Sequence, residues 1–104
     1  MKTNRKVYIG KRHIKNIDKL AESLNLTQFE IIDKIITDWI NCHDEKYSIS
    51  VPDTFIYRSI QISESNWTSI SNIAKSRNKP GTRFFAIIID EWMSKYCLDK
   101  NSVL

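Results

Sequence analysis

The stretch EIIDKIITDW, residues 30–39, decides the fold, because a related stretch, FFAIIIDEW, ends 53 positions later at residue 92. Sliding the chain by 53 positions, without a gap, aligns its two halves. Identical residues then fall at Arg5/Arg58, Ile9/Ile62, Ile17/Ile70, Ala21/Ala74, Ser23/Ser76, Asn25/Asn78, Ile35/Ile88, Ile36/Ile89 and Trp39/Trp92. Most of the kept positions are periodic apolar ones, which is typical of two copies of one supersecondary unit.

Each half opens with a short alternating stretch, KVYIG at residues 6–10 and RSIQIS at residues 58–63. Alternation predicts a strand with one buried side, formed by Val7 and Ile9 in the first copy and by Ile60 and Ile62 in the second. Apolar residues then recur at helical spacing: Ile14, Ile17, Leu20, Ala21 and Leu24, matched by Trp67, Ile70, Ile73 and Ala74. Gly10 and Ser63 stand where these first helices would begin, and Asn25 and Asn78 stand where they would stop.

The repeated stretch itself could be a buried strand, but its apolar period continues for three turns and ends in polar residues, which favours a second helix. Thr27 and Glu30 form a T-x-x-E capping box before the helical pattern of Phe29, Ile32, Ile36, Trp39 and Ile40. In the second copy, Pro80, Gly81 and Thr82 interrupt the chain before Phe84, Phe85, Ile88, Ile89, Trp92 and Tyr96. Each half is therefore predicted to be strand–helix–helix.

Composition excludes several classes of protein. The 104 residues contain no apolar run long enough to span a membrane and no signal peptide, so we expect a cytoplasmic protein with reduced Cys42 and Cys97. Neither cysteine has a second ligand at metal spacing, so we expect no metal and no cofactor. His13 and His43 have no carboxylate at helical spacing, and only two glycines are present, so no catalytic site is predicted.

The net charge of +4 is distributed unevenly. Residues 1–19 carry seven basic side chains against the single acid Asp18, whereas residues 41–57 carry three acids against Lys46. A basic end suggests a polyanionic partner, although it is also consistent with a solvated face.

A strand–helix–helix unit cannot bury its apolar face alone, and a single strand leaves its hydrogen bonds unpaired. We therefore predict a mainly α fold with a short two-stranded antiparallel ribbon. The units are residues 5–43 and 58–97, joined by a linker at 44–57 and sharing one core. SISVPDTF, residues 48–55, also looks like a strand, but the next residues alternate rather than show a helical period, which favours the linker.

This order and size resemble the ribbon-helix-helix superfamily, the Arc and MetJ type of DNA-binding protein. The resemblance covers nearly all of the chain outside the linker and the ends. Most family members are homodimers of one unit, and a tandem copy is similar to the TraY-like accessory proteins of plasmid transfer. The resemblance implies an intramolecular pseudo-dimer that inserts its β-ribbon into the major groove of double-stranded DNA.

Alternation assigns the face of the ribbon that points away from the core. The predicted base-contacting residues are Lys6, Tyr8, Ser59 and Gln61, which carry side chains suited to base edges. Phosphate contacts are expected near the start of each second helix and from the repeated arginines, which are predicted to lie at the strand ends. These residues are Arg5, Thr27, Gln28, Arg58, Lys79, Thr82 and Arg83. Lys11, Arg12 and Lys15 are more simply a solvated helix face.

Two roles in DNA binding stay open: an accessory protein that binds near a plasmid transfer origin, and a transcriptional repressor of a plasmid or phage operon. The tandem arrangement favours the first, with a relaxase or further copies of the protein as partners. An antitoxin is a lesser alternative, because the tail LDKNSVL after Cys97 is short for wrapping a toxin.

Overall fold

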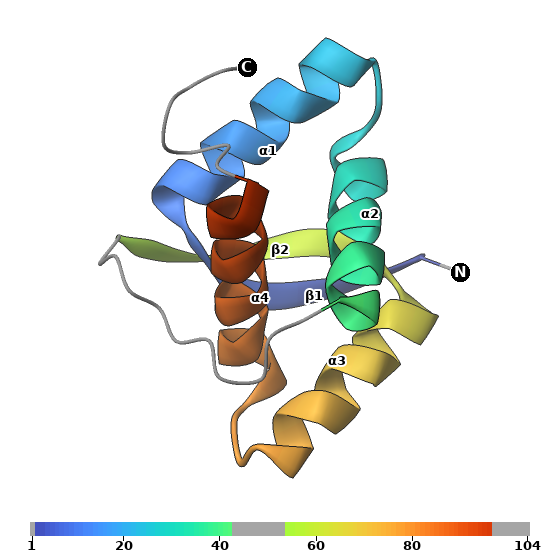
Figure 1. Cartoon of the computed structure of the whole chain (residues 1–104), viewed down its shortest axis with the longest axis vertical. Coiled ribbons are helices and arrows are strands. Elements are labelled where there is room, and N and C mark those ends of the chain that lie inside the picture. The colour runs from blue at the N-terminus through green and yellow to red at the C-terminus, as the bar shows by residue number, and fades with distance from the viewer. Residues whose placement is uncertain (1, 43–53, 97–104) are drawn as a thin grey trace.

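A computed structural model describes residues 2–42 and 54–96 (Figure 1). The elements follow one another as β1 (Lys2–Gly10), α1 (Lys11–Leu24), α2 (Gln28–Asn41), β2 (Phe55–Ser63), α3 (Glu64–Ser76) and α4 (Gly81–Tyr96). The prediction of a mainly helical protein with a two-stranded antiparallel sheet is confirmed. His43, the stretch 44–53 of the predicted linker, Cys97 and the C-terminal tail lie outside the described residues.

The two strands pair antiparallel within the chain, with Lys6 directly opposite Ser59. Both strands begin earlier than predicted, at Lys2 and at Phe55, so residues 55–57 are strand rather than linker. The predicted inner face is confirmed, because Val7, Ile9, Ile60 and Ile62 are almost completely buried. The first residues of each strand lack an alternating apolar pattern, because neither face of the ribbon is fully buried there. Cross-strand hydrogen bonding extends the ladder beyond the part that the apolar pattern marks.

The helix boundaries follow the predicted signals. The Glu30 amide donates to Thr27 Oγ1 (3.1 Å) and the Thr27 amide donates to Glu30 Oε1 (2.9 Å), which completes the capping box at α2. Ser63 caps α3 by accepting from the Asn66 amide (3.3 Å). Asn25 and Asn78 both adopt φ of 57°, the left-handed conformation that ends a helix.

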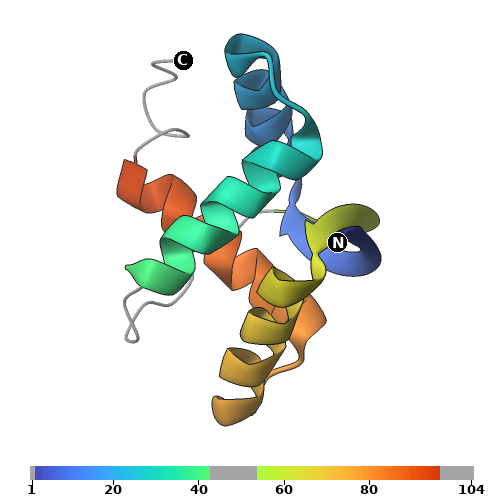
Figure 2. The same ribbon diagram turned by 90° about the vertical axis from the view of Figure 1, so that its right-hand side faces the viewer.

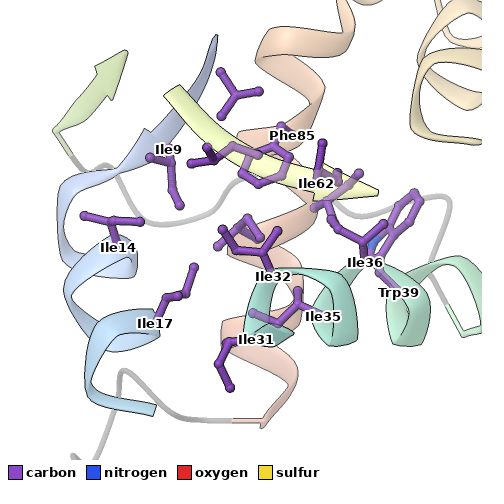
Figure 3. Close-up of a cluster of buried hydrophobic side chains, with 14 of the residues drawn as sticks. Ile9, Ile14, Ile17, Ile31, Ile32, Ile35, Ile36, Trp39, Ile62 and Phe85 are labelled. Carbon is purple, nitrogen blue, oxygen red and sulfur yellow. The ribbon is translucent and has the colours of Figure 1, made fainter. Parts of the chain in front are cut away.

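All four helices lie on one side of the ribbon (Figures 1 and 2). Helices α2 and α4 cross each other next to the strands, and α1 and α3 extend to opposite sides of this crossing. The core between helices and ribbon is shared by all six elements (Figure 3). Its members include Val7, Ile9, Ile17, Ile32, Ile36, Ile60, Ile62, Ile70, Phe85 and Ile88. Leu24, part of the predicted apolar period, is instead 53% exposed, because it lies in the last turn of α1, beyond that core.

Polar contacts connect helices of different halves inside the protein. His13 Nε2 on α1 is hydrogen bonded to Asp90 Oδ1 on α4 over 2.9 Å, and both side chains are buried. At the positions 53 residues away, Asn66 Nδ2 on α3 donates to Thr37 Oγ1 on α2 (3.3 Å) and more closely to Asp33 Oδ1 (2.7 Å). The two halves therefore make corresponding contacts with different side chains.

Within the described ranges, no helix is both long and apolar enough to cross a membrane.

Candidate nucleic-acid interface

The face of the ribbon turned away from the helices carries a row of polar and aromatic side chains. Since side chains alternate along a strand, this face is the one opposite the buried Val7, Ile9, Ile60 and Ile62. Its central members are Asn4, Lys6 and Tyr8 from β1 and Tyr57, Ser59 and Gln61 from β2, of which only Tyr8 is partly buried. No described helix covers this face (Figure 2).

Four of these six residues were predicted, whereas Asn4 and Tyr57 were missed. The predicted strands began at Lys6 and Arg58, which left both residues outside the ribbon. The signal that could have found them is strand pairing: once Lys6 lies opposite Ser59, each strand must extend to match its partner. A ladder of nine residues in each strand brings Asn4 and Tyr57 into the row.

The register sorts the row into three cross-strand pairs. Lys6 and Ser59 form the central pair. Asn4 lies opposite Gln61, and we call this pair the amide end. Tyr8 lies opposite Tyr57, with ring centroids 4.7 Å apart and planes tilted by 42°, and we call this pair the aromatic end. The two ends of the ribbon thus present different chemistry.

The ribbon is basic and free of acids. The sequences KTNRKVYIG and FIYRSIQIS contain Lys2, Arg5, Lys6 and Arg58 and neither Asp nor Glu. All twelve acidic residues of the chain lie outside the two strands. An exposed surface with only positive charge favours a polyanion.

The N-terminus of α2 lies beside the amide end. An open groove of about 240 Å³ runs between them, lined by Thr27 and Gln28 from the helix and by Asn4 and Gln61 from the ribbon. The two helix residues already have partners: Thr27 forms the capping box with Glu30, and Gln28 Nε2 donates to Asp18 Oδ1 (2.9 Å). The carboxylate of Glu30 occupies the helix end that an anion would approach.

The N-terminus of α4 lies beside the aromatic end and has the opposite character. A hollow of about 260 Å³ is lined by Tyr8 and Phe55 from the ribbon and by Arg83 from the helix. The first turn holds no acid, and the exposed Arg83 places its guanidinium carbon 4.9 Å from the Tyr8 ring centroid. The Pro80 carbonyl accepts from the amides of residues 83 and 84, so the amides of Gly81 and Thr82 have no acceptor within the helix.

The remaining predicted phosphate residues are arranged as follows. Lys79 is exposed immediately before α4, and Thr82 is partly exposed in its first turn. Arg5 and Arg58 lie in the middle of the strands rather than at their ends, which corrects the predicted position. Both are exposed despite sharing the inner phase, and the Arg5 guanidinium lies 5.3 Å from the Trp67 ring on α3.

Within the described residues, 2–42 and 54–96, no group of three or more His, Cys, Asp or Glu side chains lies close enough together to hold a metal ion. The His13–Asp90 pair, which sequence reasoning missed because the residues are 77 positions apart, is closed to any substrate, with His13 fully buried. Both hollows beside the ribbon are smaller than the roughly 300–1,000 Å³ typical of pockets for small ligands.

Comparison of the chain with models of protein families, with curated proteins and with solved structures gave no significant match.

Proposed function

We propose that this chain is a sequence-specific double-stranded DNA-binding protein of the ribbon-helix-helix type, in which two strand–helix–helix units form a pseudo-dimer within one chain. The observation that carries the proposal is the acid-free β1–β2 ribbon, whose uncovered face presents Lys6, Ser59 and Gln61. A two-stranded ribbon fits the major groove, which is about 12 Å wide, and these three side chains match the donors and acceptors of base edges.

The contacts between the halves support the pseudo-dimer. Lys6 and Ser59, which lie opposite each other, are 53 positions apart, so the ribbon is paired about equivalent residues of the repeat. His13 with Asp90, and Asn66 with Thr37, are likewise equivalent pairs. Such correspondence is what an approximate two-fold axis through the ribbon produces.

Phosphate binding is assigned mainly to the start of α4. Arg83, Lys79 and the amides of Gly81 and Thr82 meet at one helix N-terminus, where the dipole also favours an anion. This group flanks the ribbon at the aromatic end, through the contact between Arg83 and Tyr8. A phosphate bound here would hold the ribbon in register on the duplex.

The tandem arrangement of the two units favours an accessory protein of plasmid transfer, which binds near a transfer origin with a relaxase or further copies of itself. A repressor would use the same ribbon at a promoter. Footprinting separates the two roles: protection beside a nick site supports transfer, and protection over the promoter of its own gene supports repression.

The test of DNA binding is selection of duplexes from a random library, followed by titration at several salt concentrations. If about four to six phosphates are neutralised, log K falls with log salt at a slope of about −4 to −5. Lys6→Ala should weaken binding to the selected duplex, whereas Lys34→Ala, which removes the same charge from an exposed site on α2, should not. Failure to enrich any duplex, or a preference for single strands, would contradict the proposal.

A further inference from the structure

Resting on the proposed function, we infer that the two ends of the ribbon read different atoms of the major groove: the amide end reads the N6 and N7 atoms of adenine, and the aromatic end reads the methyl group of thymine.

The inference begins with the register. Asn4 and Tyr57 occupy equivalent positions of the repeat, 53 residues apart, and so do Tyr8 and Gln61. Because the strands run antiparallel, each end of the ribbon combines one residue from each half. Two identical halves would place the same pair at both ends. Here every equivalent position differs, so the amides gather at one end and the rings at the other.

The amide end is suited to adenine. A carboxamide can accept from adenine N6 and donate to N7 at the same time, and no other base offers that pattern in the major groove. Asn4 and Gln61 are both exposed and directly opposite each other. Opposed Cβ atoms are about 4.5–5.5 Å apart, so the two amides reach the same or neighbouring base pairs.

The aromatic end is suited to an apolar group. Tyr57 is 54% exposed, and its ring centroid lies 4.7 Å from that of Tyr8. The guanidinium of Arg83, from α4, lies against the Tyr8 ring. The thymine methyl is the apolar group that base edges present in the major groove. The two tilted phenol rings offer this methyl group an apolar edge.

The distance between the ends sets the spacing on DNA. Asn4 and Tyr8 are four residues apart on β1, about 13 Å at the rise of a strand. This corresponds to about four base-pair steps of 3.4 Å. The adenine contact and the methyl contact therefore fall in one short element, and the protein binds it in a single orientation.

Modified bases test each end at the level of single atoms. In the duplex selected by the native protein, 7-deazaadenine removes N7, and deoxyuridine in place of thymidine removes the methyl group. We expect 7-deazaadenine to weaken binding by about 2- to 10-fold at positions read by the amide end, the value of one hydrogen bond. Deoxyuridine should weaken binding by about fourfold at the aromatic end, the value of one buried methyl group. Each modification should have little effect at the opposite end.

A double variant exchanges the chemistry of one end. Tyr8→Gln with Tyr57→Asn gives the aromatic end the amides of the other end, at equivalent positions. The variant should select a duplex sensitive to 7-deazaadenine at both ends and insensitive to deoxyuridine. Its fold is checked by circular dichroism, and the measurements on the native protein stand even if the variant does not fold.

The outcomes separate the two proposals. If no duplex is enriched, the proposed function fails. If a duplex is bound specifically but both ends respond alike to both modifications, the protein binds DNA, and the inference that its two ends read different base atoms is wrong.

Discussion

The first turns of α2 and α4 occupy equivalent positions in the two halves, yet they use the helix N-terminus differently. In α2, Thr27 and Glu30 satisfy the free amides with the protein's own side chains. In α4, Pro80 and Arg83 stand at those two positions, with no acid in the first turn. A helix N-terminus attracts negative charge in either case. Glu30 at the third helical position supplies this charge in α2, whereas Arg83 at the same position leaves the start of α4 without a carboxylate.

The largest expected difference between the halves concerns their tryptophans. Trp39 is 3% exposed, donates from Nε1 to Glu91 Oε1 (3.0 Å) and meets Phe84 edge-on, whereas Trp92 is only partly buried. Trp39→Ala should lower the free energy of unfolding by about 3–5 kcal/mol, measured by urea denaturation. The equivalent positions of the two tryptophans in the repeat would suggest equal losses, but the partial exposure of Trp92 predicts a smaller loss for Trp92→Ala. Equal losses would show that the halves bury their rings alike.

A smaller difference is expected between the equivalent polar contacts. His13→Ala removes a fully buried partner of Asp90 and should cost about 1–3 kcal/mol of stability. Asn66→Ala removes a more exposed contact with Thr37 and Asp33 and should cost about 0.5–1.5 kcal/mol. Thermal unfolding of the two variants measures this contrast. A larger loss at Asn66 would mean that the interface between α2 and α3 holds the halves together more strongly than that between α1 and α4.

The two helix starts should separate stability from DNA binding. Thr27→Ala should cost about 1 kcal/mol of stability through loss of the cap and leave DNA affinity nearly unchanged. Arg83→Ala should leave stability nearly unchanged, weaken binding to all duplexes alike and reduce the salt slope by about one. If Thr27→Ala instead weakens DNA binding as much as Arg83→Ala, a phosphate must bind α2 despite the carboxylate of Glu30.

No effect at all is expected from protein concentration. Because β1 and β2 of the same chain pair, the unfolding midpoint should stay constant across a hundredfold range of concentration. Pairing between chains would instead add about 2.7 kcal/mol of apparent stability over that range. Calorimetry at both limits distinguishes the two arrangements.

Local signals predicted most of the fold. The capping box at Thr27, the left-handed Asn25 and Asn78, and the buried faces of both strands each depend on residues close together in sequence. The strand starts did not have such a signal, because Lys2–Arg5 and Phe55–Tyr57 are held by the opposite strand rather than by an apolar pattern. As a result, half of each end of the outward row was missed.

Contacts between the halves were beyond local reasoning. The pairing of His13 with Asp90 depends on how α1 and α4 pack, and no spacing along the chain marks it. The hydrogen-bond partners of Thr27 and Gln28 also limit what residue type alone can predict. Both residue types are suited to phosphate binding. However, Gln28 already donates to Asp18, and Thr27 already accepts from the Glu30 amide. Side-chain type predicts what a residue can bind, and packing decides what remains available.

The pairing of two unlike strands from one chain also affects how this surface can change over generations. In a symmetric dimer, one codon specifies two places on the surface, so every substitution is made twice at once. Here Asn4, Tyr8, Tyr57 and Gln61 are each encoded separately and each occurs once on the ribbon. A substitution at one end therefore leaves the other end intact. The two ends can diverge one residue at a time while the other half of the surface stays unchanged.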